Sequence, residues 1–274
     1  MIAARRGDRA RLDLVLVARG LADSRAKAQA LILAGRVTSG RLRLDKPGAL
    51  VPPDAPLAVA PGRRYVGRGA GKLAPALVAF GIDPRGRDAL DVGASTGGFT
   101  QVLLEEGAAR VAAVDVGRGQ LDWSLRNDPR VVPIEGVNAR YLAVSDLPFV
   151  PSLAVVDVSF IGLALVLPAV CSCVAPEADV VALVKPQFEV GRGRVGKGGI
   201  VREPELWDEV LRDLLATAYE RGWGPQGVVR SALAGASGNV EFFLRLTPGA
   251  PAEDAAALAA ARHEAVHGAS DRAR

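Results

Sequence analysis

The sequence is poor in the residues that build disulfide frameworks and metal sites. Its 274 residues include only two cysteines and two histidines. Cys171 and Cys173 stand in one apolar segment, and no second Cys or His pair is spaced to complete a zinc site. We therefore expect two small core residues, with neither a disulfide nor a metal centre.

Long hydrophobic runs are also missing. The most apolar stretch, residues 161–174, is too short to span a bilayer and contains Pro168, which favours a buried helix behind a strand. The N-terminal residues do not pair a basic region with an apolar stretch and a small-residue cleavage site. These features predict a cytoplasmic protein without membrane contact, and nothing in the sequence requires a protein partner, so we expect a monomer.

What is present is a composition of 49% hydrophobic and 23% charged residues, enough for one α/β domain and a smaller neighbour. The charge is divided unevenly between them. Residues 1–73 carry 15 Lys and Arg against 5 Asp and Glu, a net charge of +10, whereas residues 74–274 carry 19 against 25, a net charge of −6. A basic module that holds a polyanion beside a second module that does the chemistry would show this pattern. A merely solvated basic face would show it too.

The basic front segment resembles an S4 RNA-binding domain. Apolar residues recur with helical spacing near residues 12–16 and 28–32, Asp23 or Ser24 can cap the second helix, and Gly35 leads into a strand. The resemblance implies that four basic side chains contact phosphates without reading sequence: Arg11, Arg25, Lys27 and Arg36.

A glycine-rich bridge follows this segment and predicts a domain boundary. We expect an S4-like domain over residues 1–61, a linker over 62–68 and a catalytic domain over 69–274. Apolar runs of strand length alternate with helix-length segments in the last part, which predicts an α/β, Rossmann-like fold with a mostly parallel sheet. The predicted strands cover residues 89–92, 111–114, 131–134, 153–156, 180–184, 227–231 and 242–246.

The strongest chemical signal is the segment from Asp91 to Thr100, which follows a strand and opens a helix. Its glycines let the backbone approach a ligand, and Asp115 at the end of the next strand can accept hydrogen bonds from ribose hydroxyls. The spacing is not G-x-G-x-x-G, so S-adenosylmethionine is favoured over NAD. The expected cofactor residues are Asp91, Gly93, Ser95, Thr96, Gly97, Gly98, Phe99, Asp115 and Asn138.

Two other motifs point to different chemistry. Residues 93–97 fit the G-x-S-x-G turn of hydrolases, but the histidines, His263 and His267, lie in an Ala-rich C-terminal segment. Residues 191–197 approach a phosphate-binding loop, yet Gly198 stands where the magnesium-binding Ser or Thr belongs. We therefore expect neither activity, and interpret the second motif as a basic loop that touches RNA.

Several longer runs resemble the TlyA, or hemolysin A, family of S4-domain-containing, FtsJ-like ribosomal RNA 2′-O-methyltransferases. They are residues 91–100, 117–130 (GRGQLDWSLRNDPR), 157–161 (DVSFI), 184–191 (VKPQFEVG) and 237–243 (SGNVEFF). The resemblance implies a catalytic tetrad of Lys72, Asp157, Lys185 and Glu241. It also implies RNA contacts by Arg63, Arg64 and Arg68. The linker departs from the family, which usually has Arg-x-Trp-Val where this chain has Arg-Arg-Tyr-Val at residues 63–66.

These residue types suit methyl transfer to a ribose hydroxyl, which is a poor nucleophile until its proton is removed. Lys185 is the expected base, because the ammonium of Lys72 and a bound sulfonium both disfavour its charged form. Asp157 would orient the lysine, and Glu241 would hold Lys72 or the ribose.

The resemblance implies a cytidine of ribosomal RNA as target, in the 30S subunit, the 50S subunit or both. A basic leader at residues 5–11 and a helical C-terminal segment at residues 253–267 resemble the longer family members, which modify both subunits. Two rival functions stay open at this point: a non-catalytic RNA-binding or ribosome assembly factor, and a membrane-active hemolysin.

Overall fold

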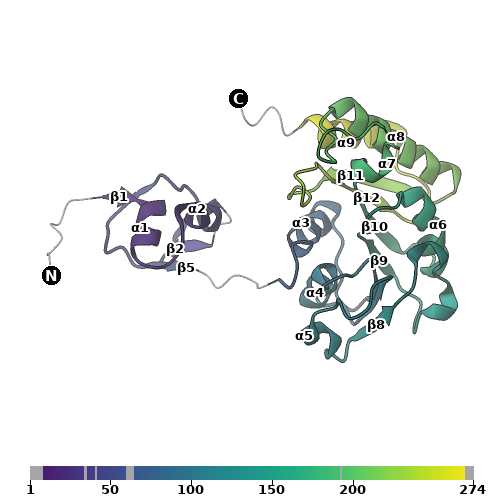
Figure 1. Cartoon of the computed structure of the whole chain (residues 1–274), viewed down its shortest axis with the longest axis horizontal. Coiled ribbons are helices and arrows are strands. Elements are labelled where there is room, and N and C mark those ends of the chain that lie inside the picture. The colour runs from purple at the N-terminus through teal and green to yellow at the C-terminus, as the bar shows by residue number, and fades with distance from the viewer. Residues whose placement is uncertain (1–8, 34–35, 41, 60–64, 192, 269–274) are drawn as a thin grey trace. The chain divides into compact units, whose positions relative to one another are not determined.

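The computed structural model describes residues 9–33, 36–40, 42–59, 65–191 and 193–268 (Figure 1). The chain divides into two compact units, Met1–Arg64 and Tyr65–Arg274. We refer to them as the N-terminal unit and, after the chemistry expected of it, the catalytic unit, and describe each by itself.

The N-terminal unit packs two short helices against small antiparallel sheets. Its elements are β1 (Ala10–Arg11), α1 (Leu12–Ala18), α2 (Arg25–Leu33), β2 (Val37–Ser39), β3 (Leu42–Leu44), β4 (Leu50–Val51) and β5 (Leu57–Val59). The strands pair as β3-β2-β5 and β1-β4. Leu12, Leu16 and Ile32 are fully buried where the helices meet, and the Ser24 hydroxyl accepts the Lys27 N–H as a cap of α2. The expected helices, the cap and the strand after Gly35 are confirmed.

One buried carboxylate organises the basic surface of this unit. The side chain of Asp13 is inaccessible to solvent beneath three longer side chains. It accepts hydrogen bonds of 3.0 Å from the Arg11 and Arg25 guanidinium groups and one of 2.9 Å from the Gln29 amide. These donors, Arg11 first, hold the pKa of Asp13 far below its usual range. Two of the arginines expected on RNA therefore also hold the fold together.

The catalytic unit is built on one seven-stranded sheet with the order β11-β12-β10-β9-β6-β7-β8. Its strands are β6 (Asp88–Val92), β7 (Arg110–Asp115), β8 (Val131–Glu135), β9 (Leu153–Val156), β10 (Asp179–Val184), β11 (Pro225–Arg230) and β12 (Phe242–Leu246). The five strands from β10 to β8 run parallel, and β12 is antiparallel to both of its neighbours. All seven predicted strands are present, and the mostly parallel sheet is confirmed.

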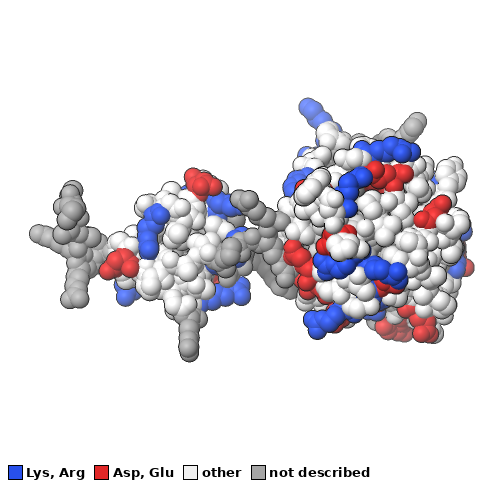
Figure 2. Space-filling model, turned by 90° about the horizontal axis from the view of Figure 1, so that it is seen from below, with Lys and Arg blue, Asp and Glu red and all other residues white. Residues whose placement is uncertain are grey.

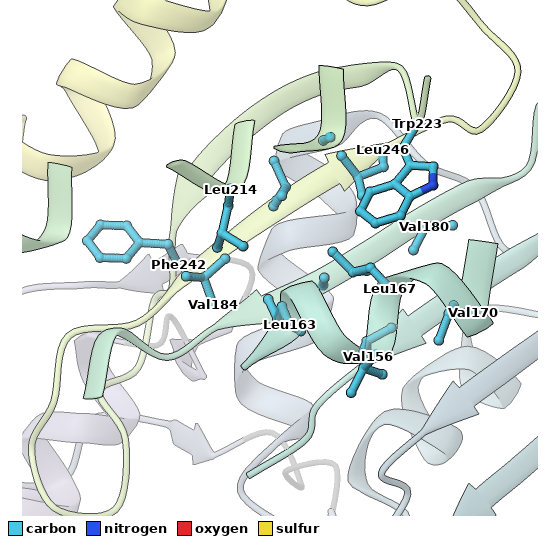
Figure 3. Close-up of a cluster of buried hydrophobic side chains, with 14 of the residues drawn as sticks. Val156, Leu163, Leu167, Val170, Val180, Val184, Leu214, Trp223, Phe242 and Leu246 are labelled. Carbon is cyan, nitrogen blue, oxygen red and sulfur yellow. The ribbon is translucent and has the colours of Figure 1, made fainter. Parts of the chain in front are cut away.

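Helices cover both faces of this sheet (Figure 1). On one face lie α3 (Ala70–Phe80), α4 (Gly98–Glu105) and α5 (Trp123–Arg126); on the other lie α6 (Leu163–Cys173), α8 (Pro204–Glu220) and α9 (Ala255–His267). Figure 3 shows the second face, where Leu163, Leu167 and Val170 of α6 pack on Val156 and Val180 of the sheet. The remaining short helices are η1 (Ala139–Tyr141), η2 (Val144–Asp146) and α7 (Pro186–Glu189).

The apolar segment over residues 161–174 forms the buried helix expected for it, with Pro168 inside α6. Cys173 is buried and both cysteines are free thiols. Within the described ranges, no helix combines the length and apolar character that crossing a membrane requires.

The Asp13 cluster generates a prediction about stability. Asp13→Asn should destabilise the N-terminal unit by about 1–3 kcal/mol, because the arginines lose a charged acceptor. Since the folded-state pKa is depressed, this contribution is complete above the unfolded pKa of about 3.9 and is lost as pH falls below it. Hydrogen exchange of peptides from residues 9–33, measured in the full chain in urea, should show the wild-type advantage at about pH 6 and its decline below about pH 4. Asp23→Asn, which changes an exposed acid, is the control. Equal protection in Asp13→Asn and wild type would contradict the prediction.

Candidate functional site

A pocket beside the sheet opens at the carboxyl ends of the parallel strands. Its volume is about 660 Å³, within the range of small-molecule sites. The residues that line it come from the turn after β6, the end of β7, the segment after β8 and the loop after β9: Gly93, Ser95, Val114, Asp115, Val116, Gln120, Val137, Asn138, Ala139, Asp157, Val158, Ser159, Phe160, Ile161 and Val166. We call it the cofactor pocket, after the ligand that the sequence analysis expects there.

The glycine turn between β6 and α4 makes the floor of this pocket. Gly93 and Gly97 have φ angles of +85° and +96°, which L side chains rarely adopt. A Cβ on Gly93 would collide with the Asp157 carbonyl oxygen, and one on Gly97 with the Leu125 side chain. Ser95 also has a positive φ, of 49°. The turn thus brings bare backbone to the pocket and against the strand that carries Asp157.

Asp115 stands at the end of β7 and joins the turn to the opposite wall. Its carboxylate accepts the Ser95 N–H at 2.8 Å and the Gly117 N–H at 2.7 Å, one on each oxygen. Each oxygen keeps a further lone pair for an outside donor. Asn138 caps η1 through the Arg140 N–H and also lines the pocket.

Beneath the turn lies a fully buried acid, Asp91. Its Oδ2 accepts the Thr100 hydroxyl at 2.6 Å, and its Oδ1 has no partner within the described part of the chain. Burial raises the pKa of Asp91 to about 7, and the nearby Asp157 adds to the rise. Asp91 therefore lies below the pocket and does not line it, whereas the other turn residues lie at its surface or beside it.

A smaller pocket of about 220 Å³ adjoins the first. Gly93, Ser95 and Asp157 line both pockets, so the two meet at these residues. The smaller pocket adds the cationic side chains of Arg68 and Lys72. Three further turn residues expected at the cofactor, Thr96, Gly98 and Phe99, line this second pocket, whereas Gly97 lines neither pocket.

The four residues of the implied tetrad form two lysine–carboxylate pairs. Lys72 Nζ donates to Glu241 Oε2 at 2.6 Å, joining α3 to the start of β12 across 169 residues of sequence. Lys185 Nζ lies 2.6 Å from Asp157 Oδ1 and donates to the Ser159 hydroxyl at 2.8 Å. Lys185 and Glu241 are buried, with 8% and 3% of their surfaces exposed. An unpaired charge is costly to bury. Lys185 is compensated by Asp157, and Glu241 is compensated by Lys72.

The loop after β9 supplies pocket residues that the sequence analysis did not single out. Ser159 receives the hydrogen bond from Lys185, and Phe160 is 91% exposed at the pocket rim with a φ of +63°. The Phe160 ring lies 5.0 Å from that of Phe188. The DVSFI run contained both residues, and their position directly after a strand that ends in Asp157 was the available signal.

The basic residues expected on RNA are distributed over both units. Arg11 and Arg25 meet at Asp13, Lys27 is exposed on α2, and Arg36 precedes β2. Arg68 instead belongs to the smaller pocket of the catalytic unit. Arg63 and Arg64 lie outside the described residues. On the face of the catalytic unit seen in Figure 2, lysine and arginine patches are separated by acidic ones and form no continuous band.

The two competing motifs lack the surroundings that their chemistry needs. Both histidines lie on α9, 4.7 Å apart between ring centroids, and neither lines the pockets described above. In the described part of the glycine-rich segment after Val190, no helix begins before α8, and Arg194 forms an ion pair with Glu209. Lys197 is exposed.

Comparison with known protein families divides the chain in the same order. Residues 10–56 match the S4 domain, and residues 65–247 match the FtsJ-like methyltransferase family. The second match covers the glycine turn, Asp115 and all four members of the two lysine–carboxylate pairs.

Individual relatives match over nearly the full chain. The 16S/23S rRNA (cytidine-2′-O)-methyltransferase TlyA of Mycobacterium tuberculosis is 53% identical over 240 residues, covering 87% of this chain and 90% of the relative. Hemolysin A of Brachyspira hyodysenteriae is 39% identical, covering 85% and 98%. A solved structure from Streptococcus thermophilus that carries a hemolysin name is 39% identical, with a TM-score of 0.72 and 96% of each chain covered. The chain therefore belongs to the TlyA family, in which an S4 domain precedes an FtsJ-like methyltransferase domain.

Proposed function

We propose that this protein transfers a methyl group from S-adenosylmethionine to the ribose 2′-oxygen of cytidine in 16S and 23S ribosomal RNA. The observation that carries the proposal is the placement of two lysine–carboxylate pairs beside a pocket floored by the glycine turn. The 53% identical relative is named for this reaction on both RNAs.

The residues of the pocket fit the proposed cofactor. Asp115 and Asn138 offer acceptors for ribose and adenine donors, and Val116 and Ile161 add apolar surface. The Cβ-free turn at Gly93 leaves room for close approach. S-adenosylmethionine, when bound, supplies a methyl group on a positively charged sulfur.

Lys185 is the proposed proton acceptor at Nζ. In the structure its ammonium group is held between Asp157 Oδ1 and the Ser159 hydroxyl. Loss of one proton leaves a lone pair that can take the 2′-hydroxyl proton while Asp157 and Ser159 keep Nζ in place.

Glu241 fixes Lys72 by the 2.6 Å hydrogen bond, and the pair is almost fully buried. A buried, paired lysine has few rotamers, which keeps its charge at a constant distance from Asp157 across the smaller pocket. The pair therefore acts as a fixed electrostatic element, while Lys185 carries the proton.

The basic N-terminal unit would bind RNA phosphates, and Phe160 at the pocket rim would contact an RNA base. The positive charge of the front segment supplies sequence-independent affinity for phosphates. The exposed ring of Phe160 suits stacking on an unpaired base, the usual way proteins hold RNA bases outside a helix. A non-catalytic RNA-binding factor would account for the basic unit but would need neither the pocket nor the paired lysines.

The first test of the proposal concerns the cofactor. Asp115→Ala should weaken S-adenosylmethionine binding about tenfold or more in calorimetry, because the ribose acceptor and the anchor of Ser95 are both lost. Asp128→Ala removes an aspartate that likewise accepts a local backbone N–H but lies outside both pockets, and should bind normally. If the wild type binds NAD more tightly than S-adenosylmethionine, the assignment of S-adenosylmethionine as the cofactor is wrong.

The second test concerns the base. Lys185→Ala should lower kcat for methyl transfer to ribosomal RNA by about 10²–10⁴-fold, the usual contribution of general base catalysis. Its affinity for ribosomal subunits should match that of wild type, because the N-terminal unit supplies most phosphate contacts. Arg212→Ala, which removes an exposed cation of α8, is the matched control. Turnover retained in Lys185→Ala would refute the role.

The third test concerns the range of substrates. The C-terminal segment forms a true helix, α9, which packs on β11 and α8 through Leu258, Ala265 and Val266. It thus completes the catalytic unit in the way expected of the longer family members. Mass mapping of 2′-O-methylation on isolated 30S and 50S subunits should find one modified cytidine in each. Modification confined to 50S would show that this helix does not confer dual specificity.

A further inference from the structure

A second segment, residues 185–189, packs against the loop that forms one wall of the cofactor pocket. Of this segment, only Lys185 has a role in the proposed chemistry. Residues 157–162, the β9–α6 loop, and Leu163 at the start of α6 face Lys185 and helix α7 (Pro186–Glu189). At one end Lys185 pairs with Asp157, and in the middle the rings of Phe188 and Phe160 lie 5.0 Å apart. At the far end, the contact is a hydrogen bond between a carboxylate and a backbone N–H.

At that end stands Glu189, a partly buried acid whose Oε1 accepts the Leu163 N–H at 2.9 Å. Leu163 begins α6, and the N-cap residue Gly162 has no side chain that can serve this N–H. Burial raises the pKa of Glu189. Among the described residues no ion pair includes Glu189, and the hydrogen bond from the Leu163 N–H ties it to the start of α6.

The loop between these contacts is conformationally constrained. Five consecutive residues, 157–161, line the cofactor pocket. Phe160 within them has a left-handed backbone, which is costly for a residue with a Cβ and persists only where the surroundings impose it. A loop in this state depends on its end points, Asp157 on the strand side and Leu163 on the helix side.

We propose that Glu189 is a positioning residue for methyl transfer: by accepting the Leu163 N–H it fixes the β9–α6 loop, and with it the alignment of Asp157 and Ser159 on Lys185. The inference rests on the function proposed above. Glu189 acts through the loop and does not touch the reacting atoms. An error of about 1 Å in such an alignment lowers rates about 10²-fold.

The test compares three substitutions of Glu189 in the full chain. Glu189→Gln keeps an oxygen that can accept the Leu163 N–H, Glu189→Asp keeps the charge but shortens the reach, and Glu189→Ala removes the acceptor. Asp146→Ala is the matched control, because the Asp146 carboxylate accepts the Ala143 N–H at the start of η2 and lines neither pocket. It removes a helix cap of the same kind without touching the pocket wall.

We expect kcat to fall about 10- to 100-fold in Glu189→Ala and Glu189→Asp, with the KM for ribosomal subunits unchanged within about twofold. Glu189→Gln should stay within about threefold of the wild-type kcat, and Asp146→Ala should stay within about twofold. Wild-type kcat in Glu189→Asp or Glu189→Ala would overturn the proposal. So would an equal loss in Glu189→Gln, since that variant retains the hydrogen bond. If Glu189→Ala does not fold, the Gln and Asp variants still decide between these outcomes.

If the proposed methyltransferase function is wrong, the experiment gives a different result. In that case the wild type itself would not methylate ribosomal RNA. The inference about Glu189 fails instead when the wild type is active and the variants that lose the Leu163 contact are equally active.

Discussion

The register of the parallel strands is the constraint on which the site depends. Val92, Val156 and Ala182 are aligned across β6, β9 and β10. Asp157 and Gly93 therefore leave the sheet at the same level, and Lys185 leaves it a short distance beyond. A shift of one residue in β9 would move Asp157 to the other face and separate it from Lys185. The buried apolar side chains on both faces of these strands exclude such a shift, so the hydrophobic core determines where the charges meet.

The buried charged residues of the site add a second constraint, because each needs a partner of opposite charge. Lys185 and Glu241 are buried, and each is matched by a partner of opposite sign. Removing one member of a buried pair leaves an uncompensated charge, which costs about 3–5 kcal/mol. Catalytic variants at these positions thus combine chemical and structural effects, and melting curves belong beside the rates. The loop that carries Asp157 is further held by Glu189 at its helix end, which links the alignment of the pair to the start of α6.

The sequence predicted the sheet and the glycine turn well, because both leave local patterns. Buried parallel strands appear as apolar runs, and a turn that needs positive φ at Gly93 and Gly97 appears as glycine spacing. The lysine–carboxylate pairs leave no such pattern. Lys72 and Glu241 stand 169 residues apart, and only the family resemblance indicated that they act together.

Other features depended on tertiary contacts that no local pattern encodes. The sequence indicated that Arg11 and Arg25 are basic and exposed, but not that they enclose Asp13. The exposure of Phe160 results from a left-handed backbone in a loop held at both ends. The role of Glu189 follows from a contact with a backbone N–H on another element, 26 residues away in sequence. The contacts of these residues could be identified only from the folded structure.

Methylation of a ribose oxygen at this edge of the sheet is the chemistry that the paired lysines and the pocket support. It is tested most directly by identifying the atom that receives the methyl group. Purified protein is incubated with S-adenosylmethionine carrying a labelled methyl group and with ribosomal subunits that lack the modification, and the RNA is then hydrolysed with alkali. On this mechanism, label should appear in an alkali-resistant dinucleotide whose 5′ residue is 2′-O-methylcytidine. Label on a base, or no transfer to RNA at all, would contradict it.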